Sequence, residues 1–206
     1  MTLTALSRRT LVTALGLSAL VPARVLARAD RDLAAEAFVQ TEGQKALTVV
    51  NNRALSASAR AGAFRQIVDQ IADFRRISSF VLGKYARVLT PAQRQRFDVA
   101  FRTYAQRLFQ TQMASFKGDQ LKVTGSAVRA PGDSVVNTLV TGDKNAGPLV
   151  VSWRVLGSGA AFKVVDVQTR GVWLAITLQQ DFVSTIDNAG GSVEALIQKL
   201  ESGDGR

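Results

Sequence analysis

The sequence predicts an α+β fold in which a helical N-terminal half wraps one face of a twisted antiparallel sheet formed by the C-terminal half. Apolar residues recur at helical spacing up to about residue 117, and beyond Gly118 they alternate with polar residues. Short turn signals separate the alternating segments, which favours a meander of neighbouring strands. No repeat and no linker divides the chain. We therefore expect one domain over residues 30–206, with a helical half over about 30–117 and a sheet half over about 118–206.

Three helices are predicted in the first half. The segment 32–51 has a loosely helical apolar pattern that Gly43 weakens. Ser56 can cap a second helix, whose apolar residues from Phe64 to Phe74 keep the spacing of an amphipathic helix. Thr90-Pro91-Ala92-Gln93 begins the longest helix, because Thr90 and Gln93 can form a capping box around a proline at the first helical position.

Four strands and two helices are predicted in the second half. The first strand is expected to begin at residues 121–124, and the others are expected near residues 135–141, 149–155 and 162–169, with Pro131-Gly132-Asp133 and Gly-containing segments between them. Val172-Trp173-Leu174 reads as a strand end or bulge. The predicted helices that follow cover residues 179–187, closed by Gly190-Gly191, and 193–201.

The first 29 residues predict a cleaved export signal. Arg8 and Arg9 precede an uncharged stretch over residues 10–23, and Ala27-Arg28-Ala29 is a small-residue cleavage site. The apolar centre is shorter than the roughly 20 residues that a membrane span needs. The basic pair also fits the twin-arginine pattern, which leaves the twin-arginine and general secretory routes both open.

Composition excludes several classes of function. The chain has no cysteine, so a disulfide scaffold, a thiolate nucleophile and a Cys-based metal site are ruled out. It has no histidine either, which removes the commonest general base and transition-metal ligand. Cleavage after Ala29 would remove four arginines and no acids, leaving 22 basic and 16 acidic residues and a net charge of +6. The arginines are scattered rather than gathered with aromatic residues, which argues against nucleic acid as a partner.

The segment from Phe80 to Phe97, FVLGKYARVLTPAQRQRF, is the most informative part of the chain. It resembles the centre of the MlaC or toluene-tolerance family of periplasmic phospholipid-binding proteins, in which Phe-x-Leu-Gly-x-Tyr-x-Arg/Lys precedes a proline-capped helix. The segment FKVVDVQTRGVWL, starting at Phe162, resembles a second family pattern. The tail from Gly190-Gly191 to Leu200 resembles a third, and the three occur in the family's order.

This resemblance implies an NTF2-like curved sheet with an internal apolar cavity for lipid acyl chains. It further implies an auxiliary component of an ABC-type lipid transport system, which shuttles phospholipid between the outer membrane and an inner-membrane ABC transporter and so maintains outer-membrane asymmetry. The implied partners are the transporter with its MCE-type substrate-binding subunit and an outer-membrane lipoprotein complex, each docked transiently. A monomer without cofactor or metal is expected.

The matched motifs, and the faces expected to meet between sheet and helices, predict a set of acyl-chain contacts. They are Phe80, Leu82, Tyr85, Phe101, Tyr104, Trp153, Val165, Val167, Val172 and Trp173. For each residue taken alone, ordinary core packing is an equal alternative. Lys84 and Arg87 are candidates for contact with a lipid head group or a partner. Ala86 and Trp173 depart from the family pattern, so we do not infer the shape of the pocket or its acyl-chain preference from other members of the family.

Two alternatives stay open. The cargo could be a hopanoid-type polycyclic lipid, for which the bulky Trp173 is the motivating residue. An NTF2-like proton-transfer enzyme would instead need an acid and a tyrosine, and Asp166 with Tyr104 or Tyr85 are the candidates. An aspartate in a strand beside a helix more often makes a structural hydrogen bond, so we expect no enzyme.

Overall fold

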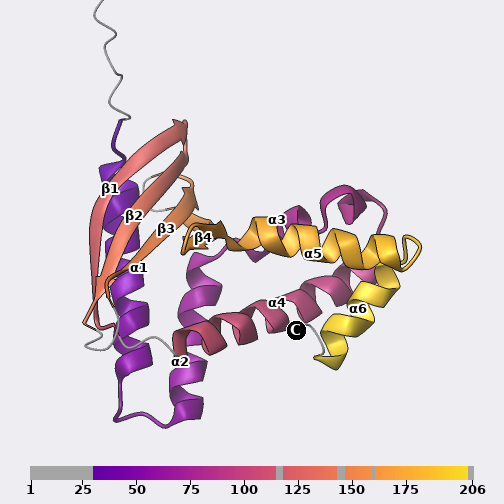
Figure 1. Cartoon of the computed structure of the whole chain (residues 1–206), viewed down its shortest axis with the longest axis horizontal. Coiled ribbons are helices and arrows are strands. Elements are labelled where there is room, and N and C mark those ends of the chain that lie inside the picture. Colours follow the sequence, from indigo (N-terminus) through magenta and orange to yellow (C-terminus); the bar gives the residue numbers. More distant parts are fainter. Residues whose placement is uncertain (1–29, 115–117, 143–146, 159–160, 204–206) are drawn as a thin grey trace, which may run out of the picture.

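The computed structural model describes residues 30–114, 118–142, 147–158 and 161–203, so the predicted export signal lies outside the described residues. Two groups of helices flank the sheet (Figure 1). In chain order the helices are α1 (Leu33–Asn51), α2 (Ala57–Ile71), α3 (Phe74–Val81), the short 3₁₀ helix η1 (Gly83–Arg87), α4 (Pro91–Ala114), α5 (Leu174–Asn188) and α6 (Val193–Ser202). None of the described helices is long and apolar enough to cross a membrane.

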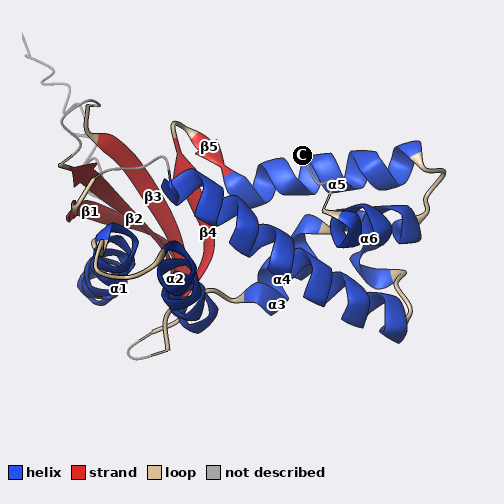
Figure 2. Cartoon of the chain, turned by 90° about the horizontal axis from the view of Figure 1, so that it is seen from below, coloured by secondary structure: helices blue, strands red, loops and turns tan. Residues whose placement is uncertain are grey.

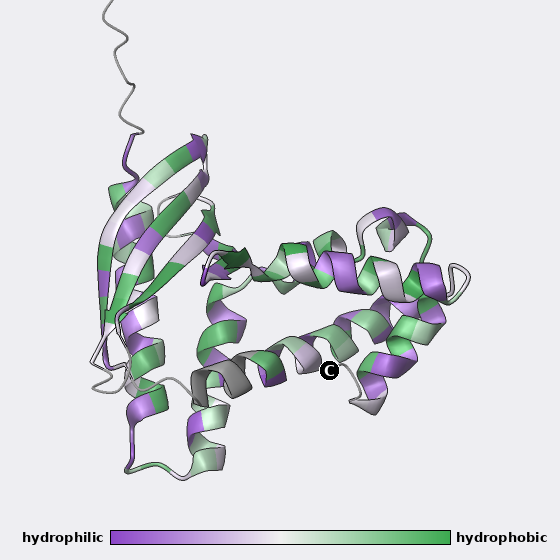
Figure 3. Ribbon diagram, viewed as in Figure 1, coloured by the Kyte–Doolittle hydropathy of each residue, from purple (hydrophilic) through white to green (hydrophobic). Residues whose placement is uncertain are grey.

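The sheet is an antiparallel meander in the order β1-β2-β3-β4-β5, which confirms the predicted fold class and strand order. Polar and apolar residues alternate along its strands (Figure 3). Arg170 and Gly171 both have positive φ and make the two-residue turn into the last strand, which pairs with the end of β4. The strands are β1 (Gln120–Ala130), β2 (Asp133–Thr141), β3 (Leu149–Leu156), β4 (Lys163–Thr169) and β5 (Val172–Trp173).

The predicted helix ends are confirmed by their hydrogen bonds. The backbone N–H of Gln93 donates to Thr90 Oγ1 at 3.2 Å, and the N–H of Thr90 donates to Gln93 Oε1 at 3.1 Å, which completes the capping box of α4. Ser56 Oγ accepts from the N–H of Ala59 at the start of α2. Gly191, with φ of 87°, donates its N–H to Ile186 O just beyond α5, as a glycine-based helix stop requires.

Two predicted boundaries were wrong. Apolar spacing continues from Phe64 to Phe74, but the helix breaks between them, because Ala72 is extended and forms a parallel bridge with Val164 of β4. The N–H of Asp73 donates to Val164 O, and the Asp73 side chain caps α3. The second boundary is the start of α5, which begins at Leu174 rather than at residue 179.

Helix α1 covers the free edge of β1 with two glutamine side chains. Gln40 Nε2 donates to Leu121 O at 2.7 Å, and Gln40 Oε1 accepts the N–H of Val123 at 3.1 Å. Gln44 makes the same pair of contacts one step along the edge, with Asp119 O and the N–H of Leu121. The two amides thus bond backbone groups that would otherwise form an open template for another strand. The close approach depends on Gly43, where an added Cβ would lie 2.6 Å from Leu121 Cδ1.

Replacing both glutamines, in Gln40→Ala with Gln44→Ala, should expose this edge. We expect a loss of roughly 1–2 kcal/mol in the free energy of unfolding, since several solvent-accessible hydrogen bonds are lost, together with concentration-dependent self-association. Urea denaturation and light scattering after size exclusion would measure both effects. Thr41→Ala, on an exposed position of the same helix, is the matched control. A double variant that stays monomeric at high concentration would contradict the edge-covering role.

The hydrophobic core lies in two layers. Helices α1 and α2 lie beside the sheet, while α3, α4, α5 and α6 pack together beyond its β4–β5 side (Figure 2). The inner face of the sheet packs on α1 through two clusters, one around Val136 and Val155 and one around Leu121 and Val140. The largest cluster lies among the helices. The layers are joined at β4 through the Val164 contacts with Ala72 and Asp73.

Candidate functional site

Four of the predicted acyl-chain contacts lie in the helical layer. Leu82 and Phe101 are fully buried, with 0% and 1% of their surfaces exposed. Tyr85 and Tyr104 are partly buried and pack against the same cluster. The helical layer therefore gathers these four residues, two of them as interior packing.

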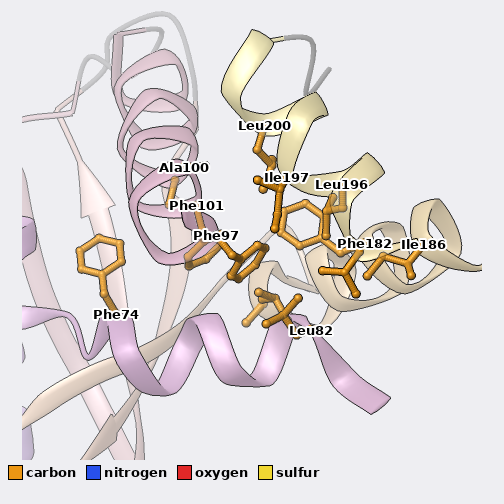
Figure 4. Packing of buried hydrophobic residues seen from close by; sticks show 14 of the residues in the cluster. Phe74, Leu82, Phe97, Ala100, Phe101, Phe182, Ile186, Leu196, Ile197 and Leu200 are labelled. Carbon is orange, nitrogen blue, oxygen red and sulfur yellow. The ribbon is translucent and has the colours of Figure 1, made fainter. Parts of the chain in front are cut away.

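Phe101 stands at the centre of an aromatic cluster (Figure 4). Its ring centroid lies 5.7 Å from Phe97 in a stacked arrangement and 6.1 Å from Phe182 in an edge-to-face arrangement. Phe74, at the other end of α3 from Leu82, makes a further edge contact with Phe101 at 6.5 Å. Such ring pairs add to the stability gained from burial alone.

Two further predicted residues, Trp153 and Val167, lie directly opposite each other on β3 and β4 and face the inner side of the sheet. Both are partly buried, and Trp153 adjoins both sheet clusters. Its indole Nε1 donates to Thr138 Oγ1 at 3.0 Å, and that hydroxyl donates to Val151 O. The hydrogen bond fixes the orientation of the ring, which presents apolar surface at the incompletely covered part of the inner face.

The other four predicted contacts do not join either group. Val165 is buried, with 7% exposed, at an irregularity of β4. Phe80 and Val172 are 40% and 49% exposed. Trp173 is partly buried at the junction of β5 and α5. The predicted set is therefore divided among a helical core, the sheet face and the surface.

The two predicted cationic contacts, Lys84 and Arg87, lie on η1. Lys84 Nζ pairs with Asp187 Oδ1 of α5 at 2.8 Å, and the hydroxyl of Tyr85 donates to the same carboxylate. These contacts lower the pKa of Asp187 and raise the pKa of Lys84. Arg87 is exposed. The charge of Lys84 is thus used to fasten the loop to α5.

Gly83 allows this loop to approach α5 closely. Its φ is +53°, and an added Cβ would lie 3.0 Å from Val183 Cγ2. Gln179 of α5 donates to Phe80 O at 2.6 Å from the same side. The Gly-x-Tyr pattern at Gly83 and Tyr85 therefore has a structural explanation, because both residues make the close contact between η1 and α5.

The acid considered for proton transfer, Asp166, has a structural task. Its Oδ1 accepts the N–H groups of Val167 at 2.8 Å and Ala175 at 2.9 Å. The second bond satisfies an N–H in the first turn of α5, which the helix itself leaves without a partner. Burial raises the pKa of Asp166 and also that of Tyr104. Among the described residues, no group of acidic side chains could hold a metal ion.

Two surface grooves were not predicted. One, of about 730 Å³, lies between α3 and α4, and the other, of about 600 Å³, is lined by α1 and by Ile67 of α2. Neither is lined by any of the ten predicted acyl-chain contacts. The sequence signal for the first groove was the spacing of Arg94, Asp98 and Arg102, which places three charged groups on one helical face.

Comparison with known proteins gives two findings. Residues 40–202 match the family model described as "MlaC protein". The fold is also similar to the solved structure of a phospholipid-binding protein from Ralstonia solanacearum in complex with a phospholipid. That similarity has a TM-score of 0.70 at 27% sequence identity, and it covers 82% of this chain and 95% of the other.

Proposed function

Because the chain belongs to the MlaC family, we propose that it is a periplasmic carrier that encloses the acyl chains of a phospholipid and moves the lipid between membranes. The observation that carries this proposal is the likeness, over most of both chains, to a protein whose structure contains a phospholipid. The predicted export signal over residues 1–29 supports the location.

Physical chemistry supports a passive carrier. Each methylene buried is worth about 0.8 kcal/mol, so a diacyl lipid faces a very large barrier to crossing water unless a protein covers its chains. Binding alone removes this barrier, and no covalent step is needed. The hydrogen bonds of Asp166 also favour binding over proton transfer, since its Oδ1 is already used by two backbone groups.

We place the acyl chains against the inner face of the sheet. Trp153 and Val167 are the predicted residues that combine apolar surface there with incomplete burial. From the helical side we propose Tyr104 of α4 as a further acyl-chain contact, because it is also partly buried. Leu82 and Phe101 would contact lipid only after separation of the helical core, because they are already enclosed. Lys84 and Arg87 remain candidates for the head group or a partner.

The proposed route runs between the outer membrane and an inner-membrane ABC transporter. This protein would exchange lipid with the transporter's MCE-type subunit at the inner membrane and with an outer-membrane lipoprotein complex at the outer membrane. The energy for directional movement would come from the transporter, because the carrier as proposed performs no chemistry. Such traffic maintains the different lipid compositions of the two outer-membrane leaflets.

Native mass spectrometry of the mature protein, purified from its own periplasm without detergent, tests the proposal. We expect an added mass of one diacyl phospholipid per chain, identified after extraction. Trp153→Arg, which puts a charge on the sheet face, should lower the occupied fraction, while Val150→Arg, on an exposed position of the same strand, should not. A copurified hopanoid would identify a hopanoid, rather than a phospholipid, as the cargo. A protein that is reproducibly empty would count against the proposed carrier function.

A further inference from the structure

The groove between α3 and α4 combines an apolar floor with a cationic rim. Phe74, Leu89 and the 65% exposed Val99 provide apolar surface, and Arg75, Arg94 and Arg102 provide charge. Its volume is about 730 Å³. Arg94 pairs with Asp98 of the lining and Arg102 pairs with Asp69 beside it, so the three guanidinium groups exceed the two carboxylates by one positive charge.

The arginines are held in place but keep donors for a ligand. Arg94 Nη2 donates to Ser78 Oγ and Ser79 Oγ at 2.8 Å each, and its Nε donates to Asp98. This network joins the two walls of the groove. Among the described residues Arg94 Nη1 bonds no other group, so this nitrogen is available for a further contact, since a guanidinium carries five N–H donors.

The other two arginines are more accessible. Arg102 bonds Asp69 through Nη1 alone and lies 4.8 Å above the Phe74 ring, with half of its side chain exposed. Arg75 is exposed at the start of α3. A rigid, incompletely used guanidinium is well suited to a carboxylate ligand, because two of its N–H groups can bond the two carboxylate oxygens.

We infer that this groove docks an acidic, amphipathic segment of a partner protein. A concave channel between two helices accepts a protruding segment whose apolar side reaches the floor and whose carboxylates meet the rim. A flat bilayer surface would touch the rim without reaching Leu89, which lies deeper in the groove and is only partly buried. Charge complementarity therefore selects an acidic protein, and the net charge of +6 expected for the mature chain acts in the same direction.

The groove is placed so that docking leaves the lipid-carrying parts intact. Its floor includes Ala86 and Leu89, from η1 and the loop after it, whereas Tyr85 of the same loop faces α5. Phe97 and Phe101 of α4 pack in the helical core, while Val99 faces the groove. One helix thus serves the interior on one face and the partner on the other.

The test uses the mature protein and the soluble periplasmic domain of the transporter's MCE-type subunit, the partner named by the proposed function on which this inference rests. Arg75→Glu with Arg102→Glu should raise the Kd for this domain at least about tenfold, because two rim contacts become repulsive. Arg53→Glu with Lys122→Glu changes the net charge equally at exposed positions outside the groove and should have a much smaller effect. Val99→Asn, at an exposed position of α4, removes apolar surface from the groove without changing its charge and should also weaken binding.

Two further measurements distinguish docking of the partner domain from non-specific charge effects and from a change in lipid binding. Binding of the wild type should weaken with added salt, and lipid occupancy by native mass spectrometry should be the same in every variant. Equal losses in the groove variant and its charge-matched control, or no binding by the wild type, would overturn the docking inference. So would arginine-dependent binding to phosphatidylglycerol vesicles with unchanged binding to the domain. An empty wild type would instead count against the carrier function.

Discussion

Phe101→Ala should lower the free energy of unfolding by about 3–5 kcal/mol, the range for deleting a large buried aromatic side chain. Phe101 is 1% exposed and contacts three other phenylalanine rings. Its removal would leave a void bounded by α3, α4 and α5, whose backbones are also held by other contacts, so the site would collapse only in part. Urea denaturation followed by circular dichroism measures the change.

Val99→Ala is the matched control for Phe101→Ala, since it lies two residues away on the same helix with its side chain exposed. Its unfolding free energy should change by no more than about 0.5 kcal/mol. Lipid occupancy, measured on the same samples, shows whether Phe101 packs in the core or lines a lipid pocket. If Phe101→Ala loses lipid while its stability stays within 1 kcal/mol or so of the wild type, the residue lines a pocket and its core role is wrong.

The sequence predicted the strand order and several helix ends because their signals are local. The Thr90 and Gln93 capping box needs only the spacing of two polar residues around a proline, and the structure contains it. The meander follows from short turns between alternating segments. Each of these features involves residues close in sequence, so no tertiary information was required.

The break between α2 and α3 could not be predicted in the same way. The apolar spacing through Ile71 and Phe74 is compatible with a continuous helix, and the reason for the break is Val164, which is distant in the chain. The partner of Lys84 and Tyr85 is likewise Asp187, 102 or more residues away. Periodicity does not identify contacts at such separations.

The candidate site was predicted as a set of apolar positions, and the structure divides that set. An aromatic stripe on a helix has the same spacing whether it packs in a core or lines a cavity. Phe101 is enclosed, whereas Trp153 is partly exposed on the sheet face. The difference depends on which element covers each face, and this is a property of the assembled layers.

The second large effect is expected for Glu36→Gln at the start of α1. Glu36 is buried, with 7% exposed, and accepts from Arg31 Nε at 2.9 Å and from Ser126 Oγ at 2.7 Å. That serine hydroxyl also accepts the N–H of Asp32, the N-cap of α1, so the carboxylate helps to join the helix start to β1. Removing the charge from this network should cost about 1–3 kcal/mol of unfolding free energy at neutral pH, since Arg31 is half exposed and solvent screens part of the interaction.

The cost of Glu36→Gln should depend on pH in a defined direction. The hydrogen bond from Arg31 holds the pKa of Glu36 below its usual value, so the folded protein favours the ionised carboxyl. The resulting stability is complete above the unfolded pKa of about 4.3 and is lost as the pH falls through the lower pKa of the folded state. Denaturation at a series of pH values should therefore show the wild type and the variant converging in acid.

Glu42→Gln, which removes the partner of Lys45 on the surface of the same helix, provides the comparison. An exposed ion pair of this kind contributes about 0–1 kcal/mol, so its removal should have little effect at any pH. A difference between Glu36→Gln and the wild type that stays constant into acid would show that the side-chain shape, rather than the charge, stabilises the junction. A difference that disappears in acid would assign the stability to the ionised carboxyl, because protonation gives the wild type the same uncharged group as the variant.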